Sequence, residues 1–301
     1  MSTRVQFKED VERRQQIRDF ILTRLFVSLS SQDNRSLVTI KLFAALIVLA
    51  FQEYQNGWTT FIEDILSAID SAFPTQIERT ELAKLQFLTL LSEEFETPRL
   101  GSINRANLAQ YVGVEGRNVA LRFIDRYTSI YDGQTSPDSD ILREKGLNCL
   151  RNWVQFGIPS LELPQITDRL IQNFLWGGAH EICADVLHEI LNHRNTVHVQ
   201  DTIYNKLFAW LISAEMQQQV QKAISEEELC LSRSFMRVYA SFGENFYVRV
   251  LAELSKVPEG HPAPQLVYLN MTLALTNYPG HFPTDQNISF TTLNLFQHAF
   301  P

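Results

Sequence analysis

The stretch 147-LNCLRNWVQFGIP-159 combines an amphipathic helix with a signal that ends it. One face of this helix carries small or apolar residues, namely Leu142, Gly146, Cys149, Leu150 and Trp153. Gly157 can adopt the left-handed conformation that ends a helix, and Pro159 cannot continue one. The stretch therefore predicts a helix followed by a chain reversal, with Cys149 and Trp153 as packing residues.

The same pattern continues along the chain. Apolar residues recur at intervals of three and four, and alternating segments bounded by hairpin turns do not occur. We predict helices at 9–30, 35–54, 58–71, 75–95, 104–131, 138–156, 163–175, 179–193, 199–222, 226–255, 263–277 and 287–299. Pro164 fits the first turn of its helix, and Gly243 is a candidate break in 226–255. The chain is therefore predicted to be all-α.

The distribution of apolar and polar faces on neighbouring helices distinguishes a compact helical bundle from a stacked array of helix pairs. The segment 37–51 is apolar nearly all round, whereas 58–71 has one polar face. This alternation favours an α-solenoid (superhelix) of HEAT-like antiparallel helix pairs, in which each pair is buried against its neighbours. At about 40–47 residues a repeat, residues 1–301 would form a single segment of about six or seven repeats.

Composition narrows the possible partners. The chain has 301 residues, 45% of them hydrophobic, and a formal net charge of −8 from 34 acidic and 26 basic side chains. This balance argues against direct nucleic-acid binding, which needs basic surfaces, and favours basic protein partners. Ordinary solubility charge is the alternative interpretation. The ten-residue run 42-LFAALIVLAF-51 is too short to span a bilayer, so no membrane insertion is expected.

Signatures of catalysis or metal binding are missing from the sequence. The segment 180-HEICADVLHEILNH-193 is not an HExxH motif, because His180 and His188 are eight residues apart. The three cysteines form no CxxC pair, which indicates reduced thiols in a cytosolic or nuclear protein. Motifs of the GxGxxG, GxxxxGK[ST] and GxSxG types do not occur. We therefore predict no enzyme activity, no metal site and no cofactor.

Acidic residues gather between Glu63 and Glu96. This window contains Glu63, Asp64, Asp70, Glu78, Glu81, Glu93, Glu94 and Glu96, against the two cations Arg79 and Lys84. It is either a solvated helix face or an acidic surface for basic partners. From charge alone the first interpretation is favoured.

Four places along the chain, taken together, resemble one family. One is 22-LTRLFVSLSS-31 with its surroundings, or the helix 37–54, which is similar to an early repeat with a small, apolar helix. The other three are longer matches. 149-CLRNWVQFGIP-159, 88-LTLLSEEFETPRL-100 (with Ser92 where proline is usual) and 241-SFGENF-246 followed by 279-PGHFPTDQNISFTTLNLF-296 are similar to segments of the importin-β superfamily of karyopherins. Within it, they most resemble the importin-thirteen and transportin-three branch. The similarity runs from about Leu37 to Phe296, with an exportin-1-like or importin-β-like region around 34–175.

This resemblance implies a function that the spacing of residues does not show. Family members are superhelical HEAT-repeat receptors that shuttle between cytoplasm and nucleus and carry protein cargo through the nuclear pore. Their partners are the GTPase Ran in its GTP form, cargo and the FG-repeat proteins of the pore. They are several-fold longer than this chain, which would begin after the usual first helical pair.

The resemblance also points to residues that would bind these partners. Ran contacts the B helices of the first repeats, for which 9–30, 58–71 and 104–131 are the candidates. The candidate contact residues are Glu63, Asp64 and Asp70 on the second of these, and Arg117, Arg122 and Asp125 on the third. A helical-repeat scaffold for protein assembly outside nuclear transport is the alternative.

Overall fold

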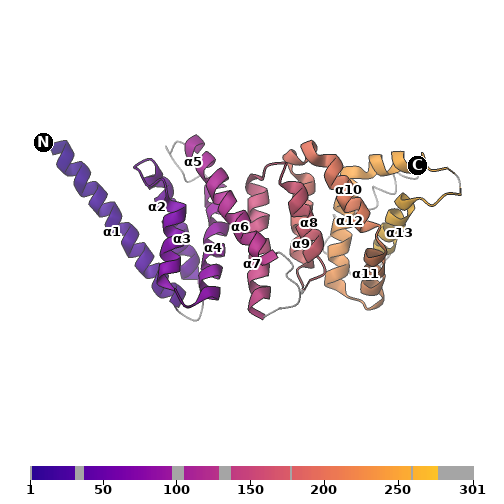
Figure 1. Cartoon of the computed structure of the whole chain (residues 1–301), viewed down its shortest axis with the longest axis horizontal. Helices are drawn as coiled ribbons and strands as arrows, with labels where there is room; N and C mark the ends of the chain where they lie inside the picture. The colour runs from indigo at the N-terminus through magenta and orange to yellow at the C-terminus, as the bar shows by residue number, and fades with distance from the viewer. Residues whose placement is uncertain are drawn as a thin grey trace. The chain divides into compact units, whose positions relative to one another are not determined.

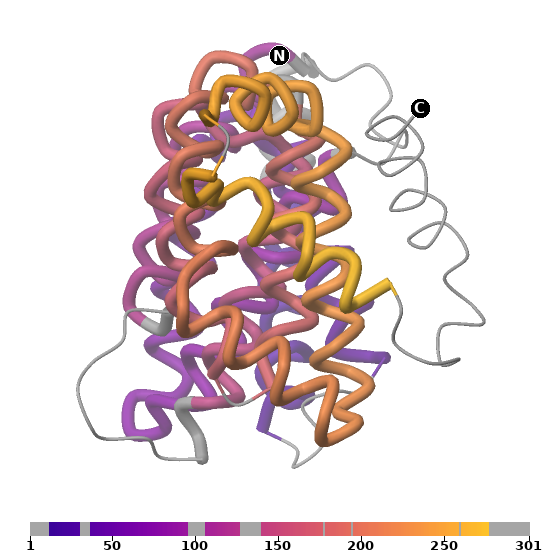
Figure 2. The backbone as a smooth tube through the Cα atoms, turned by 90° about the vertical axis from the view of Figure 1, so that its right-hand side faces the viewer, coloured from indigo at the N-terminus to yellow at the C-terminus, as the bar shows by residue number. Residues whose placement is uncertain are grey.

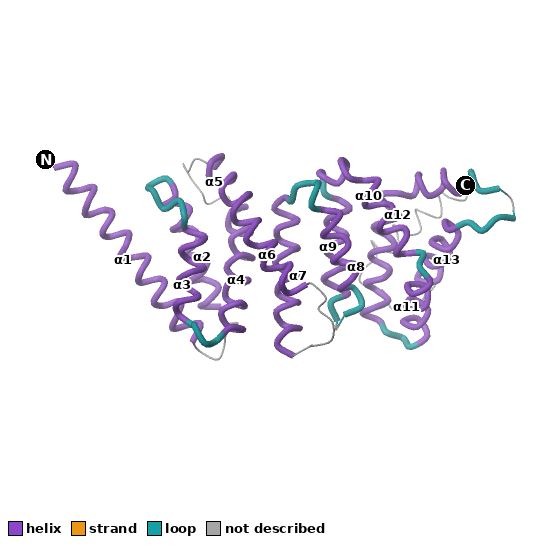
Figure 3. Tube along the Cα trace, in the orientation of Figure 1, coloured by secondary structure: helices purple, strands orange, loops and turns teal. Residues whose placement is uncertain are grey.

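The computed structural model describes residues 2–30, 37–96, 105–128, 137–176, 178–258 and 260–276. Within these ranges every regular element is a helix, and Figure 3 shows no strand among them. Successive helices are joined by short connections and pack in pairs. The predicted all-α solenoid of HEAT-like helix pairs is therefore confirmed.

The described chain divides into two compact units, with the boundary between Gly157 and Ile158. The helices of the first unit are α1 (Ser2–Ser30), α2 (Leu37–Tyr54), α3 (Phe61–Ala72), α4 (Ile77–Glu96), α5 (Arg105–Tyr111), a π-helical turn (Val112–Gly116), α6 (Arg117–Thr128) and α7 (Pro137–Gly157). Helices α2, α4 and α7 form one layer, in which α4 contacts both of the others (Figure 1). The other layer is made by α1 on α2, α3 on α4, and α6 on α7.

Aromatic side chains fill the space between these two layers. Phe51 of α2 meets Phe61 of α3 edge to face, with ring centroids 5.9 Å apart. Trp153 of α7 is fully buried and lies 5.2 Å from the Phe156 ring. The apolar helix faces predicted from the sequence are therefore the faces that hold the unit together, since buried apolar area is the main stabilising contribution.

The second unit is built in the same way. Its elements are α8 (Leu163–Asn173), α9 (His180–Asn192), a 3-10 segment (Arg194–Val199), α10 (Gln200–Leu211), α11 (Ala214–Ser225), α12 (Leu229–Leu254) and α13 (Pro264–Thr276). The long α12 packs against α9 on one side and α13 on the other, and Figure 2 shows α13 (yellow) beside α12 (orange). Helix α8 packs on α9 and α10.

The segment 147–159 behaves as its sequence predicts. The side chains of Cys149, Leu150 and Trp153 are at most 1% exposed. Gly157 has a φ of +124°, a value that a side chain would strain, and α7 ends there. Pro164 lies in the first turn of α8, also as predicted.

Several predicted helix limits differ from the structure. The helix predicted at 9–30 begins at Ser2. Two predicted helices are divided, and one predicted break is absent. The single helix 104–131 is instead α5, the π-helical turn and α6, and two glycines lie in that turn. The single helix 199–222 is divided because Ser213 is extended and its Oγ accepts a hydrogen bond from the Met216 amide, which starts α11. Gly243 does not break α12; it is buried within a continuous helix.

The length of α2 corrects the prediction that the apolar run 42–51 is too short to span a bilayer. The helix has 18 residues and, by length and composition alone, is the one described helix able to cross a membrane. In the structure Phe43, Leu46 and Phe51 are fully buried, and α2 packs against α1 and α4. Core helices pass the same composition test. One third of α2 is buried, so the helix packs into the first unit along one side and is not buried all round. The predicted helix 287–299 and the segment 279–296 lie outside the described residues.

Candidate binding groove between α3, α4 and α6

A groove of about 410 Å³ opens on the first unit where α3, α4 and α6 meet. We call it the α3–α4–α6 groove; its lining residues are Glu63, Leu66, Ser67, Asp70, Lys84, Val119, Arg122, Phe123 and Arg126. Three predicted contact residues, Glu63, Asp70 and Arg122, are among them. The tertiary structure thus brings together residues from two of the three predicted helices.

The sequence of α3 explains why two carboxylates reach the groove. Ile62, Ile65 and Ile69 are buried, and this spacing directs one face of the helix into the core. Glu63 and Asp70 are seven residues apart, two turns along the exposed side. Both face the same groove for that reason.

Glu63 is held in place by a residue from outside its own helix pair. The hydroxyl of Tyr111, at the end of α5, donates a hydrogen bond to Glu63 Oε2 at 2.8 Å. Burial, and secondarily this hydrogen bond to a carboxylate, raises the pKa of Tyr111 well above its usual value. The tyrosine therefore stays protonated and keeps donating to Glu63 throughout the physiological pH range.

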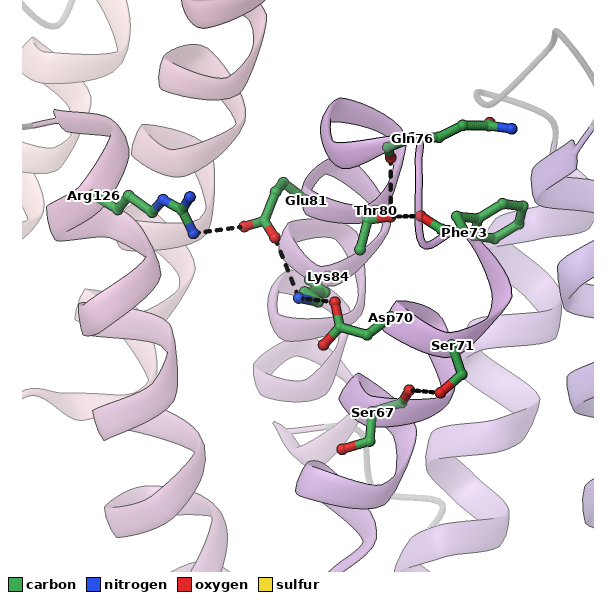
Figure 4. A network of polar contacts seen from close by, with 9 residues as sticks. All are labelled: Ser67, Asp70, Ser71, Phe73, Gln76, Thr80, Glu81, Lys84 and Arg126. Atoms are coloured by element: carbon green, nitrogen blue, oxygen red, sulfur yellow. Dashed lines mark hydrogen bonds and ion pairs between the residues drawn. The ribbon is translucent and has the colours of Figure 1, made fainter.

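Asp70 belongs to a chain of charges that crosses the groove (Figure 4). Lys84 Nζ lies 2.5 Å from Asp70 Oδ1 and 3.2 Å from Glu81 Oε1, and its side chain is only 8% exposed. Arg126 of α6 approaches the other oxygen of Glu81 at 4.0 Å. The Lys84 ammonium also lies 5.3 Å from the centre of the Phe123 ring. Such charge pairs hold each other in one arrangement, so the groove is preorganised.

The electrostatic character of the groove is mixed. Glu81, which the sequence counts in the acidic window, is only 5% exposed and is surrounded by the cations of Lys84 and Arg126. Arg122 and Arg126 are exposed on α6 and lie one helical turn apart. The window 63–96 therefore does not form one continuous exposed acidic stripe, because part of its charge is neutralised inside the fold.

Asp64 lies off the groove. Its Oδ2 accepts hydrogen bonds from Trp58 Nε1 at 2.8 Å and from Thr60 Oγ1 at 3.1 Å. The guanidinium of Arg18 lies 4.8 Å from the centre of the same Trp58 ring. These contacts stabilise the start of α3, which gives Asp64 a structural role.

Arg117 and Asp125 of α6 do not line the groove either, and both are half-buried. The exposed Arg122 donates from Nε to the Asn118 carbonyl at 3.3 Å, which orients its guanidinium along the helix. Of the three contact residues predicted on α6, only Arg122 therefore lines the groove.

The groove also contains residues that sequence reasoning did not select. Lys84 and Arg126 complete the charge network, and Tyr111 positions Glu63. The i, i+3 spacing of Glu81 and Lys84 is a sequence signal for their ion pair. The other contacts join residues that are distant in the chain and leave no local signal.

The histidine-rich segment of α9 shows no metal-binding arrangement in the part of the chain that the structure describes. Burial raises the pKa of the Cys183 thiol to about 12, so the thiol is protonated at neutral pH. His188 Nδ1 instead lies 2.7 Å from Ser241 Oγ of α12. These residues join two helices of the second unit.

The α-solenoid of HEAT-like pairs places this chain in the class of helical-repeat proteins. Comparison with known proteins narrows that class further. The family model described as "Exportin 1-like protein" matches residues 35–176. The chain is 26% identical to Importin-13 of Homo sapiens and of Bos taurus over 264 residues, and 22% identical to that of Gallus gallus over 261 residues. Each of these alignments covers 86% of this chain.

These matches support the resemblance to the importin-β superfamily that the sequence motifs indicate. The matches are also consistent with the importin-thirteen branch to which the sequence motifs point. The chain spans about a quarter of the length of these relatives, since the alignments cover 26% of each.

Proposed function

We propose that the chain is part of a nuclear transport receptor that binds Ran in its GTP form and protein cargo, and shuttles between cytoplasm and nucleus. The observation that carries the proposal is the similarity to Importin-13 along 86% of the chain, in the same region as the exportin-like match. Binding in this scheme involves no bond chemistry. Partners are held by many weak contacts distributed over a helical array.

The α3–α4–α6 groove is the proposed contact surface for Ran. Among its exposed charges, Glu63 and Asp70 are held by neighbouring side chains, and Arg122 donates a hydrogen bond to the backbone carbonyl of Asn118. Preorganised charges lose little conformational entropy on binding and select a partner with the complementary arrangement. Cargo that overlaps this surface would compete with Ran, and each would weaken the other by the same factor.

A second surface of the first unit supports the proposed interaction with FG-repeat proteins. A groove of about 510 Å³ lies along α4 and α7, with Leu29 and Ile40 contributed by α1 and α2. Leu82, Leu90 and Ile141 make much of its lining apolar. A phenylalanine side chain buried there would gain the free energy of removing its ring from water.

The Ran proposal is tested with the purified 301-residue chain and Ran loaded with either a non-hydrolysable GTP analogue or GDP. The expected result is binding of the GTP form at least about tenfold tighter than the GDP form. Equal affinity for the two forms, or binding of neither, contradicts the proposal. Nucleotide-independent protein binding would instead favour the scaffold alternative.

The α4–α7 groove is tested separately with a peptide of Phe-Gly repeats and a matched peptide in which each phenylalanine is serine. Ile141→Asn adds a polar group to the apolar lining and is expected to weaken binding of the phenylalanine peptide. Ile17→Asn serves as the matched control, because Ile17 is a similarly exposed isoleucine on α1 outside this groove. Equal binding of the two peptides contradicts this part of the proposal.

A further inference from the structure

The turn between α2 and α3 carries the single Asn-Gly dipeptide of the sequence, Asn56-Gly57. Helix α2 ends at Tyr54 and α3 begins at Phe61, and the side chain of Asn56 is exposed between them. Neither residue of the dipeptide lines the α3–α4–α6 groove or the α4–α7 groove. The function proposed above therefore makes no use of this turn.

The backbone of the turn forms a Schellman motif. Gly57 has a φ of +107°, in the left-handed region. The Trp58 amide donates to the Glu53 carbonyl at 3.1 Å, and the Gly57 amide donates to the Tyr54 carbonyl at 3.4 Å. This pair of hydrogen bonds ends a helix at a left-handed residue. The bond from Gly57 is longer than the usual range for an amide donor, so this N–H is weakly held.

We infer that Asn56 loses its side-chain amide spontaneously, which gives aspartate and isoaspartate, and that both products weaken the turn. First, the Gly57 backbone nitrogen gives its proton to a hydroxide ion of the solvent and forms a bond to Cγ of Asn56. The Cγ–Nδ2 bond breaks, the departing nitrogen takes a proton from water and leaves as ammonia, and a five-membered succinimide ring closes. Water then adds to either carbonyl carbon of the ring and opens it to aspartate or isoaspartate.

Three features of the turn favour this ring closure at an intrinsically thermolabile residue type. Gly57 has no side chain to obstruct the attack, and no other atom lies within 4 Å of the position that a Cβ would take there. Its backbone nitrogen is the weakly held donor of the Schellman motif. The exposed amide of Asn56 donates only to the Gln52 carbonyl, at 3.3 Å. Solvent therefore reaches both reacting groups.

The two products act on the turn in different ways. Aspartate places a negative charge at the C-terminal end of α2, where the helix dipole is also negative. It also replaces the donor to the Gln52 carbonyl with a second oxygen, which the carbonyl repels. Isoaspartate adds one carbon atom to the main chain before Gly57. The Trp58 amide and the Glu53 carbonyl then no longer have the spacing of the Schellman motif.

The turn also holds helix α1. The Trp58 ring donates from Nε1 to Asp64 Oδ2 at 2.8 Å, and the guanidinium of Arg18 lies 4.8 Å from the centre of that ring. One turn earlier on α1, Arg14 lies 3.4 Å from the Glu53 carboxylate. Displacement of Trp58 and Glu53 weakens both contacts. Deamidation of Asn56 therefore loosens the attachment of α1 within the first unit.

The experiment incubates the full chain at mildly alkaline pH, where hydroxide is more abundant, and follows each asparagine by peptide mapping and mass spectrometry. Conversion of Asn56 raises the mass of its peptide by one unit. Methylation by a protein isoaspartyl methyltransferase with S-adenosylmethionine identifies isoaspartate. Asn56 is expected to convert at least about tenfold faster than Asn270, an exposed asparagine of α13 that is followed by methionine. Equal rates for the two asparagines overturn the inference.

Asn56→Gln is the matched variant, because glutamine keeps the exposed amide but would have to close a six-membered ring, which forms more slowly. Its peptide is expected to show no methylation. Amide hydrogen exchange at residues 58–64 is expected to become faster on incubation of the natural chain and to stay unchanged in Asn56→Gln treated alike. Conversion of Asn56 without faster exchange at 58–64 overturns the inferred weakening of the turn. Methylation that persists in Asn56→Gln overturns the assignment of the site.

Discussion

The ammonium group of Lys84 on α4 lies 2.5 Å from the carboxylate of Asp70 on α3, and only the carboxylate side of this pair is open to solvent. The side chain of Lys84 is 8% exposed, whereas that of Asp70 is 57% exposed. The pair therefore joins a buried cation of one helix to the surface of the next. It fixes α3 against α4 at the proposed Ran surface.

Lys84→Met is expected to destabilise the first unit by about 1–3 kcal/mol. The methionine keeps the apolar stem but removes the charge that faces the buried Glu81. Urea unfolding followed by tryptophan fluorescence measures the change. Asp70→Asn is the control and should cost no more than about 1 kcal/mol, because Asp70 is exposed. Equal costs for the two variants would contradict the asymmetry of this pair.

Gly116→Ala is expected to cost about 1–3 kcal/mol, because the added methyl group would overpack the contact between the π-helical turn and α7. A Cβ at Gly116 would lie 3.0 Å from Trp153 Cη2 and 3.3 Å from Ile62 Cδ1. Thermal unfolding measures the change. At Gly113 the nearest atom would be 3.7 Å away, so Gly113→Ala is a matched control expected to be nearly neutral. A neutral Gly116→Ala would show that Trp153 does not pack closely there.

The three cysteines are expected to react at very different rates with a thiol reagent at pH 8. Burial raises the pKa of Cys149 from its usual 9.0 to about 12, and Cys183 is also buried, whereas Cys230 is exposed. One fast-reacting thiol is therefore expected in the native chain, and Cys230→Ser should remove it. A fast reaction that persists in Cys230→Ser would show that one of the other thiols is accessible.

The raised pKa of Cys149 also predicts a loss of stability at alkaline pH. The folded state holds the Cys149 proton more tightly than the unfolded state, so its contribution is fully present below pH 9. That contribution is lost as the pH rises from about 9 towards about 12. Unfolding measured in urea across this range tests it. Cys149→Ala should give a shallower decline, and an unchanged slope would contradict the assignment.

The two neighbouring acids of α3 are expected to respond differently to substitution. Glu63→Lys should weaken Ran binding about tenfold and reduce its dependence on salt, because Glu63 lines the α3–α4–α6 groove. Asp64→Ala should instead lower stability by about 1 kcal/mol through lost contacts to Trp58 and Thr60. Its affinity for Ran should stay unchanged. A binding defect in Asp64→Ala, once its fold is verified, would contradict the division of roles.

Local sequence patterns were enough to predict where most of the described helices lie. The burial of Trp153 and the left-handed Gly157 follow from side-chain spacing and backbone sterics within one helix. The division of 199–222 was missed because the extended Ser213 is a capping residue within an apolar pattern that continues on both sides.

The candidate site could be predicted only in part. Helix periodicity correctly placed Glu63 and Asp70 on one exposed face. It could not show that Tyr111 hydrogen-bonds to Glu63, since the two residues are 48 positions apart. Asp64 was grouped with the site because adjacency along a helix does not reveal which side chains have local partners.

By itself, the sequence determined that this chain is an all-α array of helix pairs with an acidic balance, because helix formation and the choice of a buried face depend on neighbours within a few residues. Only the tertiary structure decided which charges remain available. It buries Glu81 beside Lys84, pairs Lys84 with Asp70, and leaves Glu115 unpaired within the described ranges. The physical reason is that charges interact through space and through the local dielectric, which depend on packed helices and not on separation along the chain.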